Sequence, residues 1–129
     1  MDFTLKDLTG QSFTLSKQQG KPVLLIFSAT WCPSCRSEIP HFKQLYSTYS
    51  PLGLTMVNID IQESMEKVSH FSSNNALPYR ILLDMDGSVS TAYNIRGIPS
   101  LVLIGRDGNL ISREYVMMDS ILADLFHPG

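Results

Sequence analysis

Two cysteines three residues apart are the side chains in this sequence with the clearest chemical potential. Cys32 and Cys35 are the only cysteines among 129 residues, and their Trp-Cys-Pro-Ser-Cys segment follows the apolar run 22–28. If that run is a buried strand that leads into a helix, the first sulfur lies at the helix N-terminus. Unpaired N–H groups and the helix dipole favour an anion there. A thiol in such a place is more acidic, and its thiolate can attack another disulfide. The spacing therefore predicts a redox centre.

Other interpretations of the pair are less consistent with the sequence. A bridge between Cys32 and Cys35 closes almost no loop, whereas scaffold disulfides gain most by closing long ones. Two buried, inert thiols are a second structural interpretation. A zinc site would need His41 and His70 as further ligands, but neither histidine belongs to a recognisable second half of a zinc motif. A copper-carrier site would favour a longer cysteine spacing and a dedicated histidine.

The composition is that of an ordinary soluble globular protein. Hydrophobic residues make up 43% of the chain and charged residues 17%. The length suits one domain with a core of its own, which we expect to span residues 1–129. The formal net charge of −2 comes from 10 basic and 12 acidic residues without a block of either sign. This balance gives no reason to expect a nucleic acid or an anionic membrane as a partner.

Targeting signals are absent from the sequence as it stands. No apolar run approaches the ~20 residues that a membrane-spanning helix needs. Met1 leads straight into domain-like sequence, without the pattern of a signal peptide. Such a start fits either a cytoplasmic protein or one from which an export signal has been removed.

Strand and helix patterns alternate along the chain. Segments 3–5 and 12–15 alternate in polarity around the turn 9–11, which predicts a small hairpin. The run 22–28 does not alternate, as expected for a central strand that is covered on both faces. Further strands are predicted at 54–61, 80–83, 101–104 and 109–113, and helices at about 33–49, 64–74, 88–94 and 118–126. This order predicts a mixed sheet with helices on both faces.

The helices carry recognisable local signals. Pro33 suits the first helical position after Cys32, and Pro40 should kink the same helix because it removes a backbone hydrogen bond. Ser64 is a plausible N-cap of the second helix. Its apolar face is predicted to consist of Met65, Val68 and Phe71. The Asp-Met-Asp-Gly segment 84–87 lacks the later ligands of a calcium loop, so we predict a turn that leads into the third helix.

This element order, with Trp-Cys-x-x-Cys after the first buried strand, resembles the thioredoxin fold. The closer resemblance is to TlpA/ResA-like thiol:disulfide oxidoreductases, relatives of the redoxins and AhpC/TSA proteins. Their pattern Trp-Cys-x-x-Cys-x-x-Glu-x-Pro is present in full from Trp31 to Pro40. Segment 93–100, which contains Gly-Ile-Pro, resembles the family's cis-proline loop, and segment 64–83 resembles its inserted helix and strand. The resemblance implies a thioredoxin fold with a central mixed sheet flanked by helices, an N-terminal hairpin and a central α/β insertion.

The two cysteines have distinct expected roles in thiol–disulfide exchange. The Cys32 thiolate attacks a partner disulfide to give a mixed disulfide, and Cys35 then attacks Cys32 to release the reduced partner. Cys35 should be less exposed, stay protonated longer and need a base. Glu38 lies three residues later on the same helix face, so its spacing fits either an exposed glutamate or that base. The resemblance favours the base, because Ile26 occupies the place where thioredoxins commonly have a carboxylate.

The resemblance also implies a substrate-binding surface. A cis Pro99 would expose the Ile98 backbone for pairing with an extended substrate. Trp31 is either a core residue or, as in the family, part of a hydrophobic rim where partners dock. We place Pro33 on this surface as well. With no histidine between the cysteines, we expect a reducing or intermediate potential.

The expected function is exchange of electrons with protein disulfides by a monomer that needs no bound cofactor or metal. An upstream thiol–disulfide donor would supply the electrons. Resemblance alone implies an extracytoplasmic setting, periplasmic or membrane-anchored, and a part in cytochrome c maturation. A peroxiredoxin-like peroxidase is the alternative enzyme, but Thr30 does not lie three residues before the cysteine as that motif requires. A non-catalytic binding module would have little reason to combine both cysteines with Glu38 and Pro99.

Overall fold

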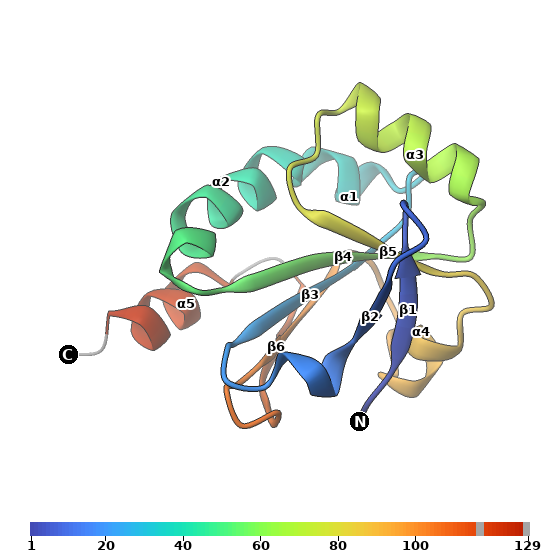
Figure 1. The fold of residues 1–129 in the computed structure, drawn as a ribbon. Helices are drawn as coiled ribbons and strands as arrows, with labels where there is room; N and C mark the ends of the chain where they lie inside the picture. The colour runs from blue at the N-terminus through green and yellow to red at the C-terminus, as the bar shows by residue number, and fades with distance from the viewer. Residues whose placement is uncertain (116–117, 128–129) are drawn as a thin grey trace.

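A mixed sheet of seven strands forms the centre of the computed structural model, which describes residues 1–115 and 118–127 (Figure 1). The strands lie in the order β2-β1-β5-β4-β3-β6-β7. Strand β3 pairs in parallel with β4, and β4 pairs in parallel with β5, while the other neighbours are antiparallel. The strands are β1 (Thr4–Asp7), β2 (Ser12–Thr14), β3 (Val23–Ser28), β4 (Thr55–Ile61), β5 (Arg80–Asp84), β6 (Ser100–Ile104) and β7 (Leu110–Glu114).

Helices cover both faces of this sheet, as predicted (Figure 1). Apolar side chains of α2 and α5 pack on one face, and α3 covers the β5 end of that face. Helix α4 packs on the opposite face together with the N-terminal hairpin β1–β2. The helices are α1 (Pro33–Ser37), α2 (Ile39–Tyr49), α3 (Met65–Asn74), α4 (Ser88–Ala92) and α5 (Asp119–Phe126), with short 3-10 turns η1 (Leu15–Gln18) and η2 (Ser50–Leu52).

Strand β3 is buried along its whole length, which explains why its sequence does not alternate. Leu24 and Ile26 pack with the α2 and α5 side chains, whereas Leu25 and Phe27 pack with those of α4 on the other face. The apolar run therefore supplies both layers of the core. Its carboxyl end leads directly into the two-cysteine segment.

The predicted kink after Cys35 is a full interruption of the helix. Helix α1 ends at Ser37 and α2 begins at Ile39, so that Pro40 occupies the first turn of α2, where its missing N–H is tolerated. Ser64 caps α3 as predicted, because its hydroxyl accepts a hydrogen bond from the Lys67 N–H at 3.2 Å. The placement of Met65 on the buried face was wrong: its side chain is 47% exposed. Residue 65 is the first of α3, and the sheet is contacted one turn later by the buried Val68.

Two polar residues interrupt the apolar side of β4. Met56, Asn58 and Asp60 alternate along the strand and lie on the face that α2 covers, because Met56 belongs to that apolar cluster. The parallel register places Asp60 opposite Ser28. The Ser28 hydroxyl donates to Asn58 Oδ1 at 2.6 Å. A small cluster of polar side chains therefore lies beneath the helix that begins with the cysteine segment.

Candidate active site

Cys32 is the N-cap of α1, as the sequence predicted. Its backbone is extended, with φ of −83° and ψ of 114°, and Pro33 begins the helix. The Cys35 N–H donates a hydrogen bond to Cys32 Sγ at 3.1 Å. Both cysteines are free thiols, and each is 4% exposed. An amide that points at the sulfur stabilises negative charge on it, which is what a nucleophilic thiolate requires.

The cis-proline segment lies against this sulfur. The Ile98–Pro99 peptide bond is cis, and the Cys32 thiol contacts the Ile98 carbonyl oxygen at 3.8 Å. Ile98 also packs against the cluster that Ala29 forms with both cysteines. The fold thus brings together two segments that are 66 residues apart in the sequence.

The remaining substrate-binding candidates lie on the surface around Cys32. Trp31 is 61% exposed, and Pro33 is exposed beside it. Trp31 and Ile98 line an open cleft of about 490 Å³, whose other walls include Ile61 and Arg96. The structure therefore places Trp31 in a position to contact a partner rather than in the core.

Cys35 lies in a different environment from Cys32. Burial of the thiol, followed by its hydrogen bond with Cys32, raises the pKa of Cys35 to about 12. The Cys35 thiol is therefore protonated at neutral pH. A step in which its sulfur acts as a nucleophile needs a group that removes the proton.

Glu38 makes its side-chain contacts away from the cysteines. Its Oε1 lies 3.3 Å from His41 Nδ1, and His41 Nε2 lies 2.6 Å from Asp119 Oδ1. Toward Cys35, only the Glu38 backbone N–H makes a hydrogen bond, to the carbonyl oxygen at 3.3 Å. The role of Glu38 as the base for Cys35 stays a prediction.

Asp60 is a site residue that sequence reasoning missed. It lines a small cavity together with Cys35, Ser28 and Asn58, and the space left for the centre of a water molecule is about 20 Å³. Asp60 is 3% exposed, and its buried Oδ1 has no hydrogen-bond partner among the described residues. Burial and the neighbouring Glu63 carboxylate raise the pKa of Asp60 to about 9, so this acid is neutral at pH 7.

Glu63 lies beside Asp60 and is held in the opposite charge state. Burial alone would raise the pKa of Glu63, but hydrogen bonds from Thr30 outweigh it and the pKa is lowered. The Thr30 N–H donates to Oε1 at 2.7 Å and the Thr30 hydroxyl donates to Oε2 at 2.6 Å. The Lys67 ammonium lies 3.2 Å from Oε2. The one sequence signal for this group is the alternation of Asn58 and Asp60 within an otherwise apolar strand.

Known proteins match this chain over most of its length. The AhpC/TSA family model matches residues 1–113. The chain belongs to this family. The thiol-disulfide oxidoreductase ResA of Halalkalibacterium halodurans is 34% identical over 111 residues, which cover 86% of this chain and 63% of that protein. ResA of Bacillus subtilis is 31% identical over 132 residues, which cover 99% of this chain and 74% of that protein.

The architecture of this AhpC/TSA protein is the thioredoxin fold. A crystal structure of a secreted Mycobacterium tuberculosis disulfide oxidoreductase, homologous to E. coli DsbE, matches it with a TM-score of 0.80 and 28% identity. The match covers 94% of this chain and 92% of that one. This AhpC/TSA protein thus resembles ResA-like thiol:disulfide oxidoreductases in both sequence and fold. The chain spans a little under two thirds of the length of the H. halodurans ResA.

The zinc interpretation gains no geometric support in this AhpC/TSA protein. Within residues 1–115 and 118–127, no three His, Cys, Asp or Glu side chains are arranged to hold a metal ion. His41, one of the two histidines considered, is placed between the Glu38 and Asp119 carboxylates instead. The thiols of Cys32 and Cys35 contact each other and the Ile98 segment.

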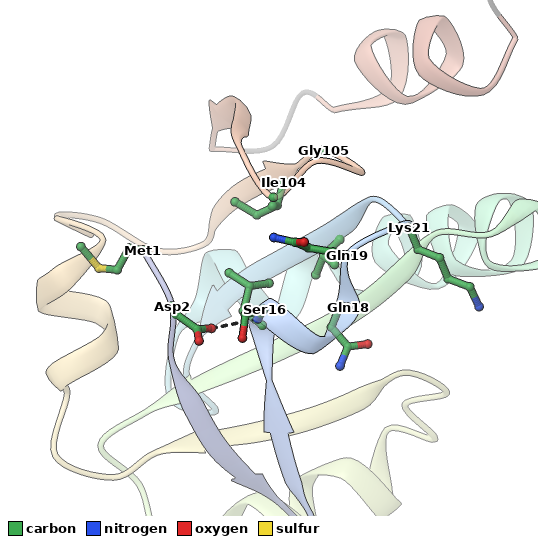
Figure 2. Close-up of a pocket in the computed structure, with 11 residues that line it drawn as sticks. Met1, Asp2, Ser16, Gln18, Gln19, Lys21, Ile104 and Gly105 are labelled. Carbon is green, nitrogen blue, oxygen red and sulfur yellow. Dashed lines mark hydrogen bonds between the residues drawn. The ribbon is translucent and has the colours of Figure 1, made fainter.

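A second cleft lies at the opposite end of the sheet from the cysteines. It has a volume of about 130 Å³ and is lined by Met1, Asp2 and Lys21, among others, where β3 begins and β6 ends (Figure 2). The Asp2 carboxylate accepts a hydrogen bond from the Ser16 N–H at 2.8 Å (Figure 2). No cysteine or histidine lines this cleft. Both cysteines lie at the other end of the sheet, after the carboxyl end of β3.

Proposed function

We propose that this protein is a thiol:disulfide oxidoreductase that exchanges electrons with protein disulfides through Cys32 and Cys35. The observation that carries the proposal is the position of Cys32 Sγ. It accepts the Cys35 N–H at the start of α1 and faces the carbonyl oxygen that precedes the cis proline. A nucleophilic sulfur and a backbone edge for binding an extended chain therefore meet at one place.

The chemistry follows from the different environments of the two thiols. The Cys32 thiolate attacks one sulfur of the partner disulfide; a new S–S bond forms and the other partner sulfur leaves as a thiolate. Cys35 then loses its proton and attacks Cys32 Sγ, which expels the second partner sulfur. The partner gains two electrons, and the protein is left with a Cys32–Cys35 disulfide. A reducing dithiol from an upstream donor reverses these steps.

The surface around Cys32 fits a protein substrate. The exposed Trp31 and the Ile98 segment line one open cleft beside the sulfur. An extended substrate strand would pair with the Ile98 backbone while Trp31 covers an apolar side chain. Pro33 and Pro99 would border the same strand. No bound cofactor enters this reaction.

The biological setting we propose is outside the cytoplasm, where the protein would act as a monomer on exported proteins. Support comes from the likeness to ResA proteins and to a structure described as a secreted disulfide oxidoreductase. Reduction of apocytochrome during cytochrome c maturation is the specific role we infer within that setting. Among the described residues, no helix has the length and apolar character needed to cross a bilayer.

Reduction of insulin disulfides by a chemical dithiol tests the activity. The native protein should accelerate the reaction, and Cys32→Ser should abolish the acceleration because the attacking sulfur is lost. Cys35→Ser should instead accumulate mixed disulfides with Cys32, visible on non-reducing gels. Failure to trap any partner would contradict the resolving role of Cys35. If the protein consumes hydrogen peroxide and leaves insulin intact, the peroxidase alternative replaces this proposal.

A further inference from the structure

The Asp60 carboxyl has a position that the fold itself does not require. It lies on the face of β4 that α2 covers, and it lines the same small cavity as Cys35. No backbone or side-chain donor among the described residues reaches its buried Oδ1. A buried polar atom without a partner destabilises a fold, so its presence points to a use.

The cavity between the two side chains has room for a single water. About 20 Å³ are open to the centre of a water molecule, which is close to the space that one buried water needs. The walls offer polar partners from Ser28, Asn58 and Asp60. A water here can hydrogen-bond to the Cys35 thiol on one side and to the Asp60 carboxyl on the other.

Glu63 continues this line of groups toward solvent. It lies beside the protonated Asp60, and its pKa is lowered by hydrogen bonds from Thr30 and by the neighbouring Lys67. The Lys67 side chain is 59% exposed, whereas the Glu63 side chain is 5% exposed. The ionised Glu63 therefore connects the buried acid to a solvated ammonium group at the surface.

We propose that Asp60 and Glu63 form the path by which the Cys35 proton leaves and returns during thiol–disulfide exchange. This inference rests on the proposed function. As Cys35 attacks Cys32, its proton passes to the cavity water, and the water gives a proton to one oxygen of the Asp60 carboxyl. The other oxygen releases its proton to Glu63, which passes it to solvent beside Lys67. The new S–S bond forms between Cys35 and Cys32, and the partner sulfur leaves with the electron pair of the broken bond.

The same path runs backwards when a donor reduces the internal disulfide. Cys35 then leaves as a thiolate and takes a proton from the water, which the neutral Asp60 replaces. A carboxylic acid that is already protonated can act in both directions, because it accepts on one oxygen and donates from the other. Asp60 is therefore a relay between Cys35 and Glu63, and Glu63 is the net base.

The charged and titratable groups around Asp60 are consistent with this role. Cys35 faces it from α1, Glu63 from the turn after β4 and Lys67 from α3, while the neutral Tyr79 lines the cavity from the segment before β5. The Lys67 charge favours the ionised form of Asp60, but burial and Glu63 outweigh it. The Glu38 carboxylate, the rival base, lies against His41.

Stopped-flow reaction of the reduced protein with an aromatic disulfide that releases a coloured thiolate tests the path. Attack by Cys32 releases one coloured thiolate, and attack by Cys35 on the mixed disulfide releases the second. Asp60→Asn and Glu63→Gln should leave the first phase within about twofold and slow the second on the order of 10²-fold near pH 7. The second phase in these variants should then rise with pH, as hydroxide replaces the relay.

Asp84→Asn is the matched control, since it removes another buried carboxyl, which does not line the Cys35 cavity and accepts hydrogen bonds from α4. Its second phase should stay within about twofold of the native rate. An unchanged second phase in Asp60→Asn, with native circular dichroism, overturns the inference, and so does equal slowing in Asp84→Asn. If Glu38→Gln alone slows the second phase, Glu38 is the base. Loss of the first phase in the native protein would instead contradict the proposed function.

Discussion

Two buried aspartates near the ends of neighbouring parallel strands differ in the hydrogen-bond donors around their carboxyl groups. Asp84 ends β5 and lies on the α4 face, where its oxygens accept hydrogen bonds from the Val89 N–H, the Ser90 N–H and the Ser90 hydroxyl at 2.6–3.2 Å. Asp60, next to the end of β4, lies on the other face, and its Oδ1 has no partner. Both residues are at most 3% exposed. Burial therefore does not reveal a carboxyl group's role, whereas its donors do.

The hydrogen-bond donors around each carboxyl group explain why Asp84 and Asp60 differ. Three donors at the start of α4 make Asp84 a structural cap, because they replace the hydrogen bonds that the carboxylate made with water. Asp60 has no such donors, and burial and the neighbouring Glu63 carboxylate keep it protonated, as a proton carrier requires. The following changes test this contrast, beginning with the largest expected effect.

Asp84→Ala should lower the free energy of unfolding by about 3 kcal/mol, because three buried donors lose their acceptor. Urea denaturation followed by circular dichroism measures the loss. Asp86→Ala is the control from the same turn, since its exposed carboxylate accepts only the Ser88 N–H, and its effect should be much smaller. Equal losses in the two variants would show that Asp84 is not the principal cap.

Asp60→Asn should change how stability depends on pH. The folded pKa of about 9 exceeds the unfolded value near 3.8, so the folded state binds the extra proton between these limits. Native stability should therefore fall as pH rises through this window, and the asparagine variant should escape the loss. The variant's advantage should grow by about 2–3 kcal/mol between about pH 6 and about pH 8.

Parallel denaturation curves at these two pH values measure the difference. The lowered pKa of Glu63 has the opposite sign, and its contribution is lost only in acid, so it does not disturb this comparison. A constant difference between variant and native protein would mean that Asp60 is ionised in the folded state.

Thr30→Val should have the smallest effect of the three, a loss of about 1.5 kcal/mol in unfolding free energy. The substitution removes the hydroxyl donor to Glu63 Oε2 and keeps the N–H donor to Oε1. Thr30→Ser retains the hydroxyl and should stay near native stability in the same denaturation assay. A loss in Thr30→Ser as large as that in Thr30→Val would mean that the hydroxyl donor contributes no more to stability than the methyl group does.

The parts of the fold that sequence predicts are those in which local pattern and burial agree. Strand β3 is buried on both faces and reads as a continuous apolar run, and the Asp-Gly pair at 107–108 lies between the antiparallel strands β6 and β7. The break at Pro40 follows from the missing N–H. Met65 shows the limit of periodicity, because its helical phase is right but it lies before the first turn that reaches the sheet.

The site was predictable only where its chemistry is local. Cys32 and Cys35 lie at the start of one helix, so their spacing in the sequence is enough to predict that they are close together. Asp60 acquires its environment from the parallel register with β3 and from α1 above it, neither of which its neighbours in sequence encode. The contact of His41 with both Glu38 and Asp119 joins residues up to 78 positions apart. Such contacts depend on tertiary packing.

The break at Glu38 gives the cysteine segment a short helix of its own. Phe42 and Leu45 anchor α2 within the largest apolar cluster on its face, whereas α1 is a five-residue segment with its own end at Glu38. A change in α1 when the S–S bond forms or breaks therefore need not alter the buried contacts of Phe42 and Leu45.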